Sequence, residues 1–213
     1  MGTHRGAAKR ILDWAFCLAA LPFAAVIGAA VALAVRLDSP GPVLYRQPRV
    51  GRNGRLFRIC KFRTMQEGSD DRAQRAFMKA YIQGCAVGKP LGGERVLYKP
   101  DQDEHLTRVG RILRRTSLDE LPQIVNVLKG DMSLVGPRPH VPWEVEEYQP
   151  WHRRRLDALP GITGLAQVHG RSGISFDRMV EYDLDYIENL SLGLDLRILG
   201  RTLVSWARGE GAA

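Results

Sequence analysis

The sequence predicts an α+β protein that is mostly helical, with one long apolar helix at its amino terminus and a small β-hairpin. Three observations lead to this prediction. A run of 25 residues near the amino terminus contains one charged side chain. An Asn53-Gly54 pair lies between two stretches of strand-forming residues. Several later segments repeat apolar residues at helical spacing, and the chain contains no internal repeats.

The composition limits the partners of the protein. The chain has 31 Lys and Arg residues against 23 Asp and Glu residues, a net charge of +8 and a pI near 9.7. This excess suits a polyanionic partner such as nucleic acid, an anionic membrane or a phosphorylated substrate. Cys17, Cys60 and Cys85 show no CxxC spacing and cannot all pair. We therefore expect buried thiols in a reduced compartment and no cysteine metal site.

The first element is the apolar segment from Ile11 to Val35, in which Asp13 is the only charged residue. As a helix it would reach about 38 Å, enough to cross the hydrocarbon core of a bilayer. Basic residues lie before the segment, and more follow it from Arg36 through Arg63. The positive-inside rule then assigns both ends to the cytoplasmic side of a membrane.

Pro22 lies near the middle of this segment and predicts a kink, because proline cannot donate to the helix ladder and crowds the preceding turn. We therefore favour a re-entrant membrane helix within residues 1–38, which enters one leaflet, bends at Pro22 and returns. A full span, a cleaved signal peptide and a buried core helix are the alternatives.

The remaining chain, residues 39–213, is predicted to form one compact domain. Two short strands meet at Asn53-Gly54. Residues 129–140 predict a turn, a short strand and a rigid Gly-Pro-Arg-Pro bend, and residues 159–173 a glycine-rich loop. The last helix is amphipathic and suits either a membrane interface or core packing. We expect helices over residues 71–82, 106–114, 117–128, 176–189 and 194–208, whereas residues 66–103 otherwise carry no readable motif.

An adjacent acid pair, Asp119 and Glu120, lies in the stretch "RRTSLDELPQ". Ser117 and Glu120 have the spacing of a capping box, and Pro122 indicates a helix start. Capping and solvated charge are the ordinary structural interpretation. A helix start is also where phosphate groups bind, and an ionised carboxylate there can attack phosphorus or hold Mg²⁺.

Basic residues could supply the positive charge that phosphoryl transfer requires on the non-bridging oxygens. Arg114 and Arg115 precede the acid pair, and Arg138 is held between two prolines. Lys61 ends a predicted strand, and Arg171 follows a flexible His-Gly pair. Each is more often a surface charge when taken alone. Their convergence on the acid pair is the hypothesis.

These residues, in this order, resemble the bacterial sugar transferase family, the monotopic phosphoglycosyl transferases that prime glycan assembly on polyprenol phosphate. The resemblance covers nearly the whole chain apart from about residues 66–103. It runs through "KRILDWAF", "DSPGPVLYRQPRVGRNG", "KFRTM", "RRTSLDELPQIVNVLKGDMSLVGPRP", "PGITGLAQVHGR" and "YDLDYIENLSLGLDLRIL".

The resemblance implies an enzyme that moves a sugar 1-phosphate from a UDP-sugar to a polyprenol phosphate such as undecaprenyl phosphate, with Mg²⁺ and release of UMP. By this analogy Asp119 attacks the β-phosphorus and forms a covalent phosphosugar-aspartyl intermediate. Glu120 assists the second step or helps Asp119 to bind the metal. The family's basic site residues correspond to Lys61, Arg114, Arg138 and Arg171.

The resemblance also implies a location and a pathway step. Residues 1–38 would form the re-entrant monotopic anchor, and residues 39–213 a catalytic domain on the cytoplasmic face of the bacterial inner membrane, with its amphipathic helix at the interface. The enzyme would initiate exopolysaccharide, capsule, O-antigen or glycoprotein glycan assembly. Membrane lipid is an expected partner and nucleic acid is not, while a homodimer stays open.

The chain departs from the family pattern at two places. Leu21-Pro22 replaces a Ser-Pro pair of some relatives, which keeps the proline but loses a hydroxyl that could bond the freed backbone. His169 replaces an asparagine in "QVHGR", and its role is left unassigned. The sequence does not indicate which sugar is transferred.

Other functions fit parts of the sequence. A Mg²⁺-dependent membrane phosphohydrolase or pyrophosphohydrolase would use the same carboxylates and arginines, with water as acceptor. A helix-turn-helix DNA binder is loosely imitated by residues 108–125, but it explains neither the apolar amino terminus nor the Gly-Pro-Arg-Pro bend. An inactive membrane scaffold would have no need of the acid pair and the basic residues together.

Overall fold

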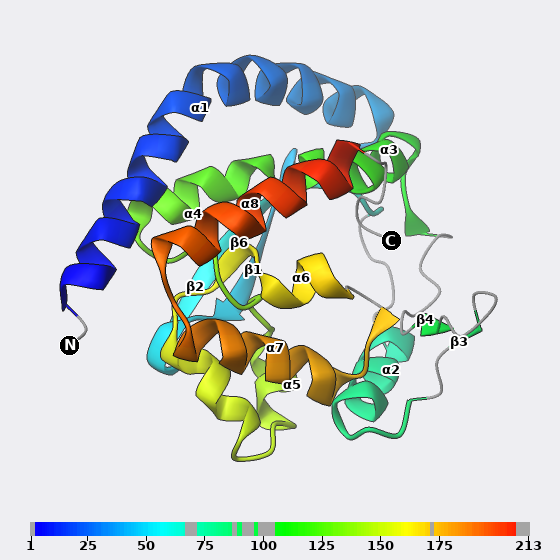
Figure 1. Cartoon of the computed structure of the whole chain (residues 1–213). Helices are drawn as coiled ribbons and strands as arrows, with labels where there is room; N and C mark the ends of the chain where they lie inside the picture. The colour runs from blue at the N-terminus through cyan, green and yellow to red at the C-terminus, as the bar shows by residue number, and fades with distance from the viewer. Residues whose placement is uncertain are drawn as a thin grey trace.

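The computed structural model describes residues 3–66, 72–86, 89–90, 96–97, 105–170 and 173–207. It is mostly helical, with a small two-stranded hairpin and a long apolar helix at the amino terminus, as the sequence predicts. That helix, α1 (Thr3–Asp38), arches over one side of the domain (Figure 1). This side carries α3 (Arg108–Thr116), α4 (Ile124–Lys129) and α8 (Leu192–Ala207). The fold is therefore a helical body with one helix laid across it.

Helix α1 is long and apolar enough, by length and composition, to cross a membrane. It contains Pro22, and its two halves run in different directions (Figure 1). Much of its middle is exposed rather than packed on the protein. The large apolar side chains exposed along α1 are Ile11, Trp14, Phe16, Leu18, Leu21, Phe23, Val26, Ile27, Leu33 and Leu37.

The amino-terminal part of α1 is attached to the domain by buried polar contacts. Lys9 Nζ lies 2.8 Å from Asp195 Oδ2 on α8 (Leu192–Ala207). Asp13 Oδ1 accepts a hydrogen bond from the Leu134 backbone N–H at 3.1 Å. One turn later, Cys17 is buried in a cluster with Ile59, Val127 and Met132.

The carboxy-terminal part of α1 is attached to the same domain. Val35 is buried in a cluster that includes Phe62 and Leu113. Asp38 Oδ2 accepts a hydrogen bond from the Val109 N–H at 3.0 Å, at the start of α3 (Arg108–Thr116). Both ends of α1 are thus fixed to one body, and its exposed middle lies between them.

The hairpin forms where the sequence predicts it. β1 (Leu44–Val50) pairs antiparallel with β2 (Leu56–Phe62), and a short 3₁₀ turn, η1 (Arg52–Gly54), joins them. Asn53 has φ 57°, a left-handed conformation that asparagine tolerates. Because side chains alternate between faces, Tyr45 and Arg49 lie on the same face as Lys61, the cross-strand partner of Tyr45.

The rest of the body consists of short elements. The predicted helix over residues 71–82 is observed as α2, and those over residues 106–114, 176–189 and 194–208 as α3, α7 and α8 with shifted ends. The sequence did not indicate α5 or η4. The remaining elements are α2 (Arg72–Ile82), β3 (Lys89–Pro90), β4 (Val96–Leu97), η3 (Leu118–Gln123), α4 (Ile124–Lys129), β5 (Ser133–Val135), α5 (Pro142–Glu146), η4 (His152–Asp157), β6 (Gly161–Thr163), α6 (Leu165–His169) and α7 (Phe176–Glu188).

Two predicted segments differ in the structure. The single helix expected over residues 117–128 is a 3₁₀ helix, η3, followed by α4. The loop expected over residues 159–173 contains β6, which pairs parallel with β5, and α6. Here Gly136 and Gly161 approach each other so closely that a Cβ atom on either would collide with backbone. The glycines reflect this close strand contact and not a loop.

The three cysteines are free thiols. Cys17 is buried as expected, but Cys60 is only partly buried and Cys85 is exposed. Cys85 lies just after the end of α2, outside the apolar clusters, so the expectation of buried thiols is wrong for this residue.

Candidate active site

The acid pair and Lys61 meet where η3 packs against β2. Lys61 Nζ lies 2.6 Å from Glu120 Oε1 and 4.0 Å from Asp119 Oδ2. Lys61 projects from the end of β2, and both acids lie in the first turn of η3. The two carboxylates therefore share one lysine unequally, with Glu120 in direct contact and Asp119 further away.

The capping box expected at Ser117 is not formed. Ser117 has φ 56° and ends α3, and its side chain makes no capping hydrogen bond. The left-handed turn reverses the chain before η3 begins, so the Glu120 side chain reaches across to Lys61 and not back to the Ser117 N–H. The positive charge at the acid pair comes chiefly from side chains, because a six-residue 3₁₀ helix contributes little dipole.

Arg138 approaches the pair from the Gly-Pro-Arg-Pro bend. Its NH1 lies 3.5 Å from Glu120 Oε1. Two arginines from other elements hold the backbone of the bend. Arg155 NH2 donates to the Arg138 carbonyl at 3.2 Å, and Arg49 NH1 donates to the Pro139 carbonyl at 3.1 Å. Neighbouring elements therefore fix the position of the Arg138 backbone.

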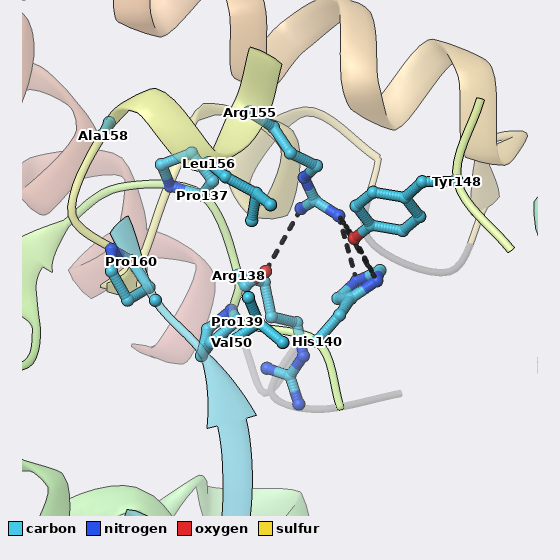
Figure 2. A pocket seen from close by; sticks show the side chains of 11 residues that line it. Val50, Pro137, Arg138, Pro139, His140, Tyr148, Arg155, Leu156, Ala158 and Pro160 are labelled. Carbon is cyan, nitrogen blue, oxygen red and sulfur yellow. Dashed lines mark hydrogen bonds between the residues drawn. The ribbon is translucent and has the colours of Figure 1, made fainter. Parts of the chain in front are cut away.

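Arg155 is the centre of a buried network behind this bend (Figure 2). Its guanidinium donates to Tyr148 Oη at 2.8 Å and to Asp183 Oδ2 at 2.5 Å. Tyr148 Oη lies 2.8 Å from His140 Nδ1. Burial, with the charge of Arg155 beside it, holds the pKa of His140 well below its usual value. A neutral His140 accepts from Tyr148, and the network is satisfied without a ligand.

The other predicted basic residues occupy different positions. Arg114 donates from Nε to Thr64 Oγ1 at 3.2 Å, within the "KFRTM" block, and its charge acts to lower the pKa of Asp119. Arg171 lies outside the described residues. His169 stacks on Tyr182 and its Nε2 lies 2.8 Å from Arg201 NH1, in contacts among α6, α7 and α8. The structure brings Lys61, Arg114 and Arg138 to the acid pair.

The two carboxylates differ in electrostatics. Burial, reinforced by the charge of Glu120, raises the pKa of Asp119 despite the opposing charges of Lys61, Arg114 and Arg138. Burial would also raise the pKa of Glu120, but the charges and hydrogen bonds of Lys61 and Arg138 outweigh it and lower that pKa to about 2. Glu120 is thus the permanently ionised, paired acid, and Asp119 is the more basic one. A more basic carboxylate is the stronger nucleophile once ionised.

Asp119 and Glu120 are the carboxylates that could contribute to a metal site. The part of the chain that the structure describes contains no group of three or more His, Cys, Asp or Glu side chains that could hold a metal ion. Mg²⁺, however, binds through one or two carboxylates together with substrate phosphates and water. Asp119 and Glu120 fit that requirement, with Glu120 Oε1 already bonded to Lys61.

A small cavity opens beside Glu120. Its lining combines a few apolar residues with polar side chains that are mostly cationic. Such a lining suits an anionic ligand. The lining residues are Arg49, Ile59, Lys61, Glu120, Gln123, Arg138, Pro139, Gly161 and Ile162.

Part of this site has no clear signal in the sequence. Gln123 and Arg49 do not stand out within their blocks, and neither do the supporting residues Arg155 and Asp183. Arg155 is one of three consecutive arginines. Nothing local separates it from its exposed neighbours, because its burial depends on Asp183 from another element.

Known proteins match this chain over nearly its whole length. The family model described as bacterial sugar transferase matches residues 4–209. The galactosyl transferase CpsE of Streptococcus agalactiae is 39% identical over 206 residues, which cover 96% of this chain and 43% of the relative. The UDP-glucose:undecaprenyl-phosphate glucose-1-phosphate transferase of Caulobacter vibrioides is 41% identical over 205 residues, which cover 92% of this chain and 68% of the relative.

The match to a third relative covers most of both chains. The exopolysaccharide production protein ExoY of Rhizobium meliloti is 37% identical over 211 residues, which cover 97% of this chain and 88% of the relative. By contrast, the chain spans less than half of the streptococcal protein. The shared region is thus the part that contains α1, the hairpin and the acid pair.

Proposed function

Because the chain belongs to the bacterial sugar transferase family, we propose that it transfers a sugar 1-phosphate from a UDP-sugar to a membrane polyprenol phosphate and releases UMP. The observation that carries this proposal is the unequal sharing of Lys61. Glu120 takes the lysine and Arg138, which leaves Asp119 as a basic carboxylate beside fixed positive charge. This arrangement suits nucleophilic attack on a phosphate.

The proposed reaction has two steps at one phosphorus atom. An Asp119 carboxylate oxygen attacks the β-phosphorus, a new P–O bond forms, and the bond from that phosphorus to the oxygen shared with the α-phosphate breaks. UMP leaves with the shared oxygen, and the sugar phosphate stays on Asp119. A phosphate oxygen of the polyprenol phosphate then attacks the same phosphorus, breaks the aspartyl P–O bond and restores the Asp119 carboxylate.

The cations have defined tasks in these steps. Lys61 and Arg138 keep Glu120 ionised and supply positive charge next to the reacting phosphate. Arg114, fixed by Thr64, lies on the Asp119 side. Mg²⁺ held by Asp119 and Glu120 would supply further charge for the phosphate oxygens when bound.

We further propose a monotopic position on the cytoplasmic face of the bacterial inner membrane. Both ends of α1 are attached to the same domain, through Lys9 and Asp195 at one end and Asp38 and Val109 at the other. A straight span would separate these ends by the thickness of the bilayer. Exposed Leu203, with other apolar side chains on α8, supports contact of this helix with the membrane surface.

Cysteine labelling tests the topology. In a chain whose native cysteines are replaced by alanine, His4→Cys and Asn53→Cys should both react with a membrane-impermeant reagent from the cytoplasmic side only. Labelling of the two positions from opposite sides would establish a full span and contradict the re-entrant arrangement.

The activity is tested with a panel of UDP-sugars, assayed with polyprenol phosphate and Mg²⁺. We expect UMP release with at least one donor and a labelled lipid product only when the acceptor is present. The named relatives include a galactosyl and a glucose-1-phosphate transferase, so both UDP-galactose and UDP-glucose belong in the panel. Continuous release of free sugar phosphate without the lipid acceptor would instead indicate the hydrolase.

A further inference from the structure

Gln123 is a buried amide in the wall of the cavity beside the acid pair. It is the last residue of η3 and is 2% exposed. Its Nε2 has no hydrogen-bond partner among the described residues. Lys61, Glu120 and Arg138 line the same cavity. A buried amide nitrogen without an acceptor is unfavourable in the ligand-free protein, which calls for an explanation.

Arg49 lines the same cavity and also has a buried donor without a partner in the described ranges. Its NH1 donates to the Pro139 carbonyl at 3.1 Å and its NH2 to Gln47 Oε1 at 2.7 Å. Its buried Nε has no partner within the described part of the chain. The side chain is thus held in place by two hydrogen bonds while a third donor is unused.

The unused groups have one chemistry. Both are N–H donors, and the other polar lining residues are Lys61, Arg138 and Glu120, the last already bonded to Lys61. A ligand that satisfies this set must offer several acceptors and negative charge at once. A sugar hydroxyl offers little charge, whereas a diphosphate offers both.

The geometry points to Gln123 Nε2 and Arg49 Nε as further substrate-binding groups that contact the diphosphate of the nucleotide sugar. This inference rests on the proposed function, because it assigns a ligand to the same cavity. A ligand-binding role and a packing role for Gln123 predict different stabilities of the ligand-free protein. A side chain that only packs stabilises the ligand-free protein, whereas a buried donor without a partner does not.

The test is UDP binding, measured by thermal unfolding and calorimetry of the full chain in lipid nanodiscs. Gln123→Met keeps the volume of the side chain and removes its donors. We expect UDP to bind about tenfold more weakly or worse, the cost of one hydrogen bond to a charged group. The ligand-free melting temperature should stay equal or rise. Gln83→Met, on a surface amide that donates to Glu147, is the matched control and should bind UDP normally.

A second variant covers the case in which Gln123→Met lowers ligand-free stability. Gln123→Glu keeps the shape and places an anion where the diphosphate would lie, so UDP binding should weaken further than in the Met variant. The inference is overturned if both variants bind UDP as the wild type does. A wild type that releases UMP from no UDP-sugar contradicts the proposed function instead, so the two failures can be told apart.

Discussion

Two carboxylate–cation clusters lie close together in this protein and are built differently. In the scaffold cluster, Arg155 and Asp183 form one ion pair whose side chains are each 1% exposed. In the site cluster, Lys61 serves both Glu120 and Asp119, with side chains 16%, 19% and 10% exposed in that order. The scaffold cluster is closed, which means that it is buried and balanced in charge. The site cluster is open, which means that it is partly exposed and that its one lysine serves two carboxylates.

The difference lies in what each cluster leaves unsatisfied. Arg155 directs its N–H groups to Asp183, Tyr148 and the Arg138 carbonyl. Around Lys61, Asp119 is only weakly paired and the Gln123 amide has an unused donor. A buried ion pair that satisfies itself positions the backbone, whereas groups left unsatisfied are available to a ligand. The closed cluster holds the bend that brings Arg138 to the open one.

The largest expected effect comes from Asp119→Asn. We expect UMP release to fall by at least about a thousandfold, because the amide cannot form the covalent phosphosugar intermediate. Stability should be unchanged or higher, because burial raises the pKa of Asp119 and its charge therefore costs free energy in the folded state. UMP release, intact-protein mass and thermal unfolding measure these effects.

Asp185→Asn, at an exposed position on α7, is the control for the Asp119 substitution and should retain activity. Substantial UMP release by Asp119→Asn would sink the nucleophile assignment. It would also remove the distinction between an open and a closed cluster, because the weakly paired acid would then have no chemical role.

The closed cluster predicts a loss of stability. Arg155→Met leaves the Asp183 carboxylate buried and unpaired, which should cost about 3–5 kcal/mol of unfolding free energy. Chemical unfolding in detergent measures it. The double variant Arg155→Met with Asp183→Leu should recover part of that loss, because no unpaired charge remains. Unchanged stability with lost activity in Arg155→Met would instead show that Arg155 acts in the reaction.

A smaller effect is expected on the pH dependence of the first step. Since the pKa of Asp119 is raised and that of Glu120 is about 2, acid should abolish the UMP burst by protonating Asp119 while Glu120 stays ionised. Glu120→Gln removes a charge that raises the pKa of Asp119 and frees Lys61 to pair with it. The acid limb of the plot of burst amplitude against pH should therefore move to lower pH.

Burst amplitudes of the wild type and Glu120→Gln, measured across the acid range in single-turnover assays, test this prediction. A limb that stays in place or moves to higher pH would mean that Asp119 and Glu120 are not electrostatically coupled. The two acids would then need separate explanations.

Local sequence signals predicted much of the fold. Asn53-Gly54 predicted the hairpin, and both residues have the positive φ angles that the connection between β1 and β2 requires. The apolar run predicted a long amino-terminal helix, and α1 extends beyond the run at both ends. The same local approach failed at Ser117, where a capping pattern was overridden by a left-handed residue that ends α3. It also failed for β6, because a parallel pair with β5 joins segments far apart in the chain.

The residues of the site also divide into those with a local sequence signal and those whose position depends on distant parts of the chain. The acid pair and Lys61 could be found because each lies in a short block that has chemical meaning by itself. Gln123 and Arg49 could not, since the evidence for a role is an absent partner in three dimensions. Arg155 could not be separated from Arg153 and Arg154 for a related reason. In η4 only the face that meets Asp183 is buried, and that face is set by α7.

The smallest effect is expected at the residue next to Arg155, and it tests whether burial decides the comparison. Arg154 NH2 lies 2.9 Å from Glu188 Oε1, but these side chains are 58% and 60% exposed. Water screens such a pair, so Arg154→Met should change the unfolding free energy by less than about 1 kcal/mol. Chemical unfolding of Arg154→Met and Arg155→Met under one set of conditions measures the difference in unfolding free energy. If Arg154→Met cost as much unfolding free energy as Arg155→Met, the short distance and not the burial would account for the stability of the scaffold cluster. The Lys61–Glu120 contact, at 2.6 Å, is also short. The site cluster would then no longer differ from the scaffold cluster in the way that burial implies.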